Sequence, residues 1–397
     1  MEIPKGFKQT AVGILPDEWE TRNIDNCCSI KARIGWQGLT KSEYLDHGDY
    51  LLITATDFEN GFINWASCFY VSEERYLQDT NIQIQPGDVL ISKDGTIGKV
   101  AFLPTIPKPG TLNSGVFVVR PKNGFRIDKT FLSLIFKSVW FKEFIDQLTA
   151  GSTIVHLYQK DFVKFNLVFP SSLDEQKRIA AAISDVDELI ASFNQQIEKK
   201  RQIKEGAMQQ LLTGKTRLPG FTEPWKQWSL GELLEYEQPT QYLVSSTEYV
   251  DNGIPVLTAG KSFILGYTNE DSGIYRKLPV IIFDDFVTSS KFVDFPFKAK
   301  SSAMKMLSLR DKKNNLRLIY EMMQLIDFPM TDHKRYWIAE YSKLVIKLPS
   351  QKEQNAIAQI LSDMDEEIRQ LEAERDKFTL VKQGMMQELL TGKTRLN

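Results

Sequence analysis

The chain has 397 residues, of which 42% are apolar and 25% charged, and its formal net charge is −2. These values are typical of a globular protein with two or three domains. No apolar run reaches the length of a membrane span, and the start, MEIPKGFKQT, lacks the apolar core of a signal peptide. Three cysteines without metal spacing and three histidines leave little for a zinc site or histidine-based catalysis. We therefore expect a reduced cytoplasmic protein with no metal and no membrane partner.

The charges are unevenly distributed along the sequence. Residues 22–90 hold 5 Lys/Arg and 10 Asp/Glu, whereas residues 91–164 hold 11 and 5. The second half repeats the pattern, with 2 and 8 in residues 221–275 and then 14 and 8 in residues 276–347. If the fold gathers each basic portion on one face, that face can contact phosphates despite the neutral total. Ordinary surface charge without such a face is the alternative.

Short strand signals separated by turns dominate the first part of the chain. They fall at Tyr50–Thr54, Asp88–Ser92, Gly115–Arg120 and Lys164–Phe169. GDVLISKDGTIGKVAF predicts a strand, a turn at Asp94-Gly95 and a second strand. A polar loop with one aromatic residue, GSTIVHLY, precedes the last strand.

A long helix follows at about residues 174–212. Its apolar residues recur in steps of 4 and 3 from Ile179 to Ile197, which is the seam of a coiled coil. Its 39 residues would span roughly 58 Å at 1.5 Å per residue. Gly214 and the basic residues beside it are typical of a helix end. The sequence GKT here lacks the earlier glycine of a nucleotide-binding loop and follows its helix, so we do not interpret it as an ATP site.

The second half repeats this plan. A PGF–PW segment like that of the N-terminus begins it, and VIIFDDFVTSSKFVDFPF stands where the first half has its strand–turn–strand. Residues 174–218 and 352–396 align without a gap, with 22 identities in 45 positions. A single apolar stripe needs a partner helix. The other copy is the simplest partner because it is tethered to the same chain, and a coil between two chains is the alternative. Gly206 and Gly384, inside both helices, suggest close helix approach, a partner's footprint or an inherited defect.

Three features point to one family. They are the doubled EQxxIAxxIxDxDExI…MQxLLTGKTRL helix, the PGF–PW joint, and the globular segments that contain GDVLISKDGTIGK and VIIFDDFVTSSKFVDFPFKAKSS. Over essentially its whole length the chain resembles the specificity subunit of type I restriction-modification systems. The sequence itself shows no S-adenosylmethionine loop, base-methyltransferase motif, HExxH or nucleophile elbow.

The resemblance implies an α+β protein, with two mixed α/β target recognition domains separated by two long helices that form an intramolecular antiparallel coiled coil. The expected domains are residues 1–172, 173–218 (first helix), 219–349 and 350–397 (second helix). It implies that each recognition domain reads one half of a bipartite, asymmetric site in double-stranded DNA, while the coil sets the spacer. The implied partners are two modification (methyltransferase) subunits and restriction subunits. No cofactor is expected in this non-catalytic chain; S-adenosylmethionine, ATP and Mg²⁺ are expected on the partners.

The predicted DNA contacts are polar, basic or aromatic residues in loops of the basic portions and near the start of the first domain. For each residue, the alternative is an ordinary surface position that makes no contact with DNA. In the first domain they are Lys31, Arg33, Trp36, Gln37, Lys41, Lys93, Thr96, Lys99, Ser152, Thr153 and His156. In the second they are Ser289, Ser290, Lys291, Lys298, Lys300, Ser301, Ser302, His333, Lys334, Arg335 and Tyr336.

Two other functions stay open from the residues alone. One is a solitary nuclease whose carboxylates bind Mg²⁺, which would cleave DNA without partners. The other is a coiled-coil scaffold that never meets DNA, which would show no salt-dependent duplex binding.

Overall fold

The structure, a computed structural model, describes residues 3–10, 12–150, 156–258, 260, 262–329 and 335–396, and leaves out the side chain of Trp36. The chain divides into two compact units. Unit 1 comprises Met1–Ser192 and Arg375–Asn397, and unit 2 comprises Phe193–Glu374. Each unit therefore contains one globular domain and a part of both long helices. Among the described residues, no helix is both long and apolar enough to cross a membrane.

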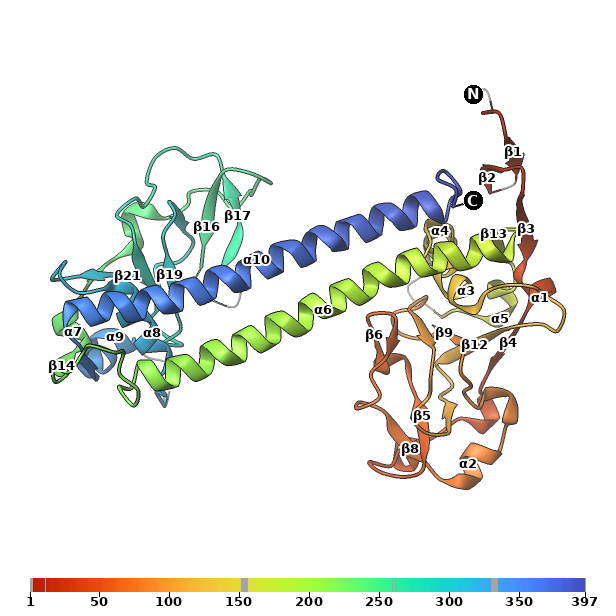
Figure 1. Ribbon diagram of the computed structural model, residues 1–397, viewed down its shortest axis with the longest axis horizontal. Helices are drawn as coiled ribbons and strands as arrows, with labels where there is room; N and C mark the ends of the chain where they lie inside the picture. The colour runs from red at the N-terminus through yellow and green to blue at the C-terminus, as the bar shows by residue number, and fades with distance from the viewer. Residues whose placement is uncertain are drawn as a thin grey trace. The chain divides into compact units, whose positions relative to one another are not determined.

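The domain of unit 1 is built on two sheets (Figure 1). The antiparallel sheet has the order β10 (Val100–Leu103), β9 (Asp88–Ser92), β12 (Val116–Pro121), β4 (Cys28–Ala32). The second sheet has the order β11 (Gly110–Leu112), β5 (Tyr50–Ile53), β8 (Phe69–Val71), with β11 parallel to β5. Smaller pairs join β1 (Phe7–Thr10) to β2 (Gly13–Pro16), β3 (Trp19–Asn23) to β13 (Asn166–Pro170), and β6 (Phe58–Glu59) to β7 (Phe62–Ile63). The described α-helices of this domain are α1 (Ile24–Cys27), α2 (Glu73–Leu77), α3 (Lys129–Ile135), α4 (Val139–Thr149) and α5 (Gln159–Phe162).

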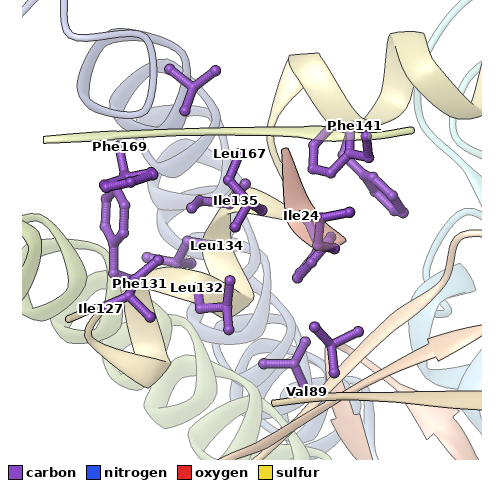
Figure 2. Close-up of a cluster of buried hydrophobic side chains, with 14 of the residues drawn as sticks. Ile24, Val89, Ile127, Phe131, Leu132, Leu134, Ile135, Phe141, Leu167 and Phe169 are labelled. Carbon is purple, nitrogen blue, oxygen red and sulfur yellow. The ribbon is translucent and has the colours of Figure 1, made fainter. Parts of the chain in front are cut away.

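The main core of unit 1 lies where α3 and α4 pack on the antiparallel sheet and on β13. Val89 on β9, Phe131 on α3 and Leu167 on β13 are fully buried in it, as Figure 2 shows. All five residues of β9 are buried. Its three central residues are apolar, while Asp88 pairs with Arg120 at 2.6 Å and the Ser92 hydroxyl is hydrogen-bonded to the turn that follows. Asp128 caps α3 by accepting a hydrogen bond from the Phe131 amide at 2.8 Å, so the helix begins beside its own buried aromatic residue.

The domain of unit 2 repeats this topology. Its antiparallel sheet has the order β19 (Ser290–Val293), β18 (Val280–Asp284), β21 (Met304–Leu309), β15 (Leu234–Glu237), and its second sheet has the order β17 (Ile264–Thr268), β16 (Ile254–Leu257), β20 (Lys298–Ala299). The sheet β20–β16 is parallel, as β11–β5 is in unit 1. This domain also has β14 (Lys226–Ser229), paired with β22 (Val345–Leu348), and the α-helices α7 (Leu230–Leu233), α8 (Leu316–Gln324) and α9 (Tyr336–Ala339). The two domains thus share one scaffold.

The two long helices are α6 (Leu173–Leu211) and α10 (Gln351–Leu389), each of 39 residues. Within each unit they pair antiparallel, because low numbers on one meet high numbers on the other (Figure 1). In unit 1, Lys382 contacts Asp187 at 2.5 Å, and in unit 2, Lys204 contacts Asp365 at 2.7 Å. The seam residues Ile183 and Leu361 are fully buried. The predicted α+β fold with paired intramolecular helices is confirmed.

The repeated TGKTRL tail has a structural role at both helix ends. Gly214 and Gly392 each adopt a φ of 71° just beyond the helix, a conformation that suits glycine. The arginine of each tail then reaches the first turn of the other helix. Arg395 contacts Glu175 at 2.5 Å, and Arg217 contacts Glu353 at 2.7 Å. Both tails therefore close helix ends, as the sequence predicts.

Gly206 and Gly384 have nothing within 4 Å of the position that a Cβ would occupy. Close helix approach is therefore not the reason for these glycines in the described structure. A partner's footprint and inheritance from a common ancestor remain as explanations.

Lys137, which follows α3, carries a charge in an unfavourable place. Burial and the nearby Lys382 ammonium lower the pKa of Lys137 from 10.5 to about 8, and Asp187 offsets this only in part. The folded-state pKa is depressed, so the destabilisation is present in full below pH 8 and fades as the pH rises toward 10.5.

We therefore expect Lys137→Met to raise the free energy of unfolding at pH 7 by about 1–2 kcal/mol, a value reduced for partial solvent access. Urea denaturation at pH 7 and pH 10 checks this, and the gain should shrink at the higher pH. Lys142→Met, at an exposed position one turn along α4, is the control and should stay within about 0.5 kcal/mol at both pH values. If the gain in the free energy of unfolding were the same at both pH values, the charge of Lys137 would not be its cause.

Candidate nucleic-acid interface

The turn between β9 and β10 presents basic and polar side chains from unit 1. The Ser92 hydroxyl fixes it by donating to the Thr96 carbonyl at 2.6 Å and accepting from the Lys99 amide at 2.9 Å. Thr96 and Lys99 are exposed, whereas Lys93 is half-buried, with its ammonium 5.3 Å from the centre of the Phe117 ring. The turn therefore holds two accessible donors on a rigid backbone, an arrangement that suits phosphate or base-edge contact.

A loop from far along the sequence meets this turn. The Leu157 amide donates to the Lys93 carbonyl at 2.9 Å, and the His156 imidazole contacts the Asp94 carboxylate. The His156 ring also lies 4.5 Å from that of Tyr158. The structure thus brings Lys93, Thr96, Lys99 and His156 together, while Ser152 and Thr153 lie outside the described residues.

The segment 31–41 divides between surface and interior. Lys31 on β4 and Lys41 are exposed. The Arg33 side chain is 1% exposed and donates to the Leu112 carbonyl at 2.8 Å and the Thr111 hydroxyl at 3.1 Å. Burial, aided by the charge of Arg75, lowers the pKa of Arg33. Arg33 and Gln37 are predicted to contact DNA, but the structure places both side chains in the interior of the domain.

The equivalent turn of unit 2, between β18 and β19, has a different surface. The Asp284 carboxylate accepts hydrogen bonds from the amides of Phe286 at 2.8 Å and Val287 at 3.1 Å. Both apolar side chains at this tip are exposed, and the prediction from sequence missed them. The available signal was an Asp-Asp-Phe-Val-Thr turn, in which apolar residues have no strand to join.

Asp285 connects this turn to the rest of the unit 2 domain. Its carboxylate contacts the Lys305 ammonium at 3.0 Å and accepts from the Trp337 amide at 2.8 Å. Its carbonyl accepts from the Tyr336 amide at 2.9 Å. The Asp285 and Lys305 side chains are each 2% exposed, so the ion pair is an internal support rather than a contact surface.

The remaining predicted contacts of unit 2 also divide between the interior and the surface of the domain. Lys298 is buried against Glu270 at 2.6 Å, and that contact lowers the pKa of Glu270 to about 2. Ser290 accepts from the Gln324 amide group at 2.8 Å and is also buried, as is Tyr336. Lys298, Ser290 and Tyr336 are predicted to lie at the surface, but the structure places all three side chains in the interior. His333 and Lys334 lie outside the described residues. The predicted contacts of unit 2 that remain exposed or half-buried are Ser289, Lys291, Lys300, Ser301, Ser302 and Arg335.

The turn between β9 and β10 and the turn between β18 and β19 occupy equivalent positions but carry different side chains. The Lys93 amide donates to Gly115 on the neighbouring strand, as the Asp285 amide does to Ala303. The strand registers then make Lys305 the counterpart of Phe117. A lysine over a ring in unit 1 therefore corresponds to an aspartate–lysine pair in unit 2. Among the described residues, no group of three His, Cys, Asp or Glu side chains is placed to hold a metal ion.

Two like domains with unlike loops, joined by paired helices, define a class of protein with two separate recognition surfaces. The family model for the type I restriction modification DNA specificity domain matches residues 16–201 and 222–377. The chain therefore belongs to this family. The match includes both domains and most of both helices.

Relatives and solved structures agree with this membership. The chain is 48% identical over 174 residues to the type I restriction enzyme EcoR124I/EcoR124II specificity subunit of Escherichia coli, an alignment covering 42% of this chain and 41% of that protein. It is 24% identical over 426 residues to the putative type I restriction enzyme MjaX specificity subunit of Methanocaldococcus jannaschii, covering 99% and 97%. The crystal structure of an S subunit from M. genitalium matches with a TM-score of 0.60 at 16% identity, covering 98% of both chains, and thus shares the fold.

Proposed function

We propose that this chain is the DNA-specificity subunit of a type I restriction-modification complex. Each globular domain, residues 1–172 and 219–349, reads one half of a bipartite and asymmetric site in double-stranded DNA. The observation that carries the proposal is the pair of equivalent turns on one scaffold, with Thr96 and Lys99 on one and Phe286 and Val287 on the other. The same scaffold with different surface chemistry favours two different sequences over one sequence read twice.

We further propose that the paired helices set the number of unread base pairs and dock two modification subunits. These partners hold S-adenosylmethionine and methylate adenine, and restriction subunits bring ATP- and Mg²⁺-dependent translocation and cleavage. The chain itself supplies recognition without catalysis and works where the genome lies, in the cytoplasm. Support comes from family membership and from relatives whose names describe specificity subunits.

A domain exchange tests the proposal. Residues 20–170 are replaced by the equivalent segment of a family member with another target, and the chain is co-expressed with its modification subunits. Mapping of N6-methyladenine across the host genome should show one half of the methylated motif changed and the other half kept, because each domain reads alone.

The unmodified chain, co-expressed in the same way, is the control. A motif changed in both halves, or in neither, would refute independent reading. Cleavage of DNA by the purified chain with Mg²⁺ and without partners would instead support a solitary nuclease.

A further inference from the structure

The turn between β18 and β19 presents two apolar side chains on a fixed backbone. Phe286 is 39% exposed and Val287 is 50% exposed. The Asp284 carboxylate accepts hydrogen bonds from the amides of both residues, and the Asp284 carbonyl accepts from the Thr288 amide at 3.0 Å. Thr288 has a φ of 53°, a left-handed conformation that is uncommon for a residue other than glycine. The turn is therefore held by its own hydrogen bonds while both apolar side chains stay in contact with solvent.

The same hydrogen bonds leave the tip of this turn without donors for a ligand. Successive backbone amides at a turn can bind the oxygens of a phosphate. Here the amides of Phe286, Val287 and Thr288 all donate to Asp284. The side chains of Phe286 and Val287 carry no donor or acceptor of their own. The surface that the tip offers to a ligand is thus apolar.

The equivalent turn of unit 1 offers donors in this place. Ser92 ends β9 and its amide donates to the Lys99 carbonyl at 2.9 Å, as the amide of Asp284, at the end of β18, donates to the Ser289 carbonyl at 2.8 Å. The two turns therefore begin and end at equivalent residues. The first exposes Thr96 and Lys99, which can donate to base edges, whereas the second exposes an apolar tip.

Cationic side chains flank the apolar tip. Lys291 follows the turn on β19 and is exposed. Arg335 is also exposed, and the residue after it donates its amide to the Asp285 carbonyl at 2.9 Å. Lys300 is half-buried and lies three residues before the carbonyl that accepts from the Asp285 amide. The Asp285 carboxylate is itself neutralised by Lys305 at 3.0 Å. Positive charge around the tip favours a nucleic acid as its ligand over an apolar protein surface.

We propose that the domain of unit 2 recognises thymine with this tip. Phe286 and Val287 cover the 5-methyl group of one thymine in the half-site that residues 219–349 read, while the flanking cations contact phosphates. The thymine methyl is the apolar group that base edges present in the major groove, and it is the group that side chains without donors can read. The inference rests on the proposed function because it takes DNA as the ligand. It makes the two domains read by different chemistry, with hydrogen bonds at one turn and apolar contact at the other.

Removing the methyl group from the DNA tests the inference without changing the protein. Mapping of N6-methyladenine gives the motif, and the domain exchange identifies the half that unit 2 reads. Each thymine of that half, on either strand, is then replaced by deoxyuridine, which lacks only the 5-methyl group. The full-length chain, assembled with its modification subunits, should bind one of these duplexes about fourfold more weakly at a fixed salt concentration, the effect of burying one methyl-sized group.

A variant of the protein assigns this difference to the tip. Phe286→Ala/Val287→Ala should bind the thymine and deoxyuridine duplexes equally, because the apolar cover is gone. Val345→Ala shortens another apolar side chain of unit 2, which is 59% exposed on β22, and should keep the fourfold difference. Circular dichroism confirms folding of both variants, and the measurement on the unmodified chain decides the matter even if the double variant does not fold.

Three results would overturn the inference. The unit 2 half of the motif could contain no thymine on either strand, or the unmodified chain could bind every deoxyuridine duplex as tightly as the thymine duplex. A folded double variant could also keep the fourfold difference, even if it binds both duplexes more weakly. If the unmodified chain directs methylation of a bipartite motif, each of these results leaves the proposed function standing. If it directs no sequence-specific methylation with its partners, both proposals fail.

Discussion

Lys305→Met is expected to lower the free energy of unfolding of unit 2 by about 3–5 kcal/mol and to abolish reading by its domain. The substitution removes the ammonium that lies 3.0 Å from the Asp285 carboxylate, and both side chains are 2% exposed. A buried carboxylate without its counterion pays a desolvation penalty that one remaining amide does not offset. Because Asp285 also accepts hydrogen bonds from the amides of Tyr336 and Trp337, the turn and α9 should lose their relative position together.

The double variant Asp285→Asn/Lys305→Met separates the charge from the packing. Asparagine keeps the oxygen that accepts from the Trp337 amide at 2.8 Å but carries no charge, so most of the lost stability should return. Lys291→Met, an exposed lysine on the neighbouring strand β19, should change stability by less than about 0.5 kcal/mol. Urea denaturation gives the free energies, and N6-methyladenine mapping shows which half of the motif is lost. A loss below about 1 kcal/mol for the single variant would show that Asp285 does not depend on Lys305.

The helices and the main strands could be predicted because their signals are local. The step pattern of α6 predicts a helix over 174–212, and the structure has Leu173–Leu211. The strand signal at Asp88–Ser92 is β9 itself. Short-range periodicity indicates which face of an element is buried, and the repeated helix shows the same periodicity twice in one chain.

Which polar side chains face outward could not be predicted in the same way. Arg33 and Lys298 look like surface cations in loop-rich stretches of the sequence. Their burial depends on Thr111 and Glu270, which are 78 and 28 residues away in the sequence. The partner that satisfies a buried charge comes from tertiary structure, so composition alone cannot separate a DNA contact from an internal ion pair.

The same reasoning predicts a large effect at the repeated tail. Arg395→Met should lower the free energy of unfolding of unit 1 by about 2–3 kcal/mol, because it leaves the Glu175 carboxylate, 3% exposed, without its partner at 2.5 Å. The value is below that for a fully buried pair because the Arg395 side chain is 21% exposed. The measurement is urea denaturation of the full-length chain.

A double-mutant cycle decides whether the loss comes from this pair. Glu175→Met/Arg395→Met removes both charges and should recover most of the stability, since apolar side chains can replace a buried pair at little cost. Lys200→Met breaks an exposed pair between the same two helices, Lys200 with Glu367, whose side chains are 44% and 54% exposed, and should cost no more than about 0.5 kcal/mol. Equal losses for Arg395→Met and Lys200→Met would mean that the TGKTRL arginine is only a surface charge. An unequal result of the expected size would assign the repeated motif to joining the end of one helix to the start of the other.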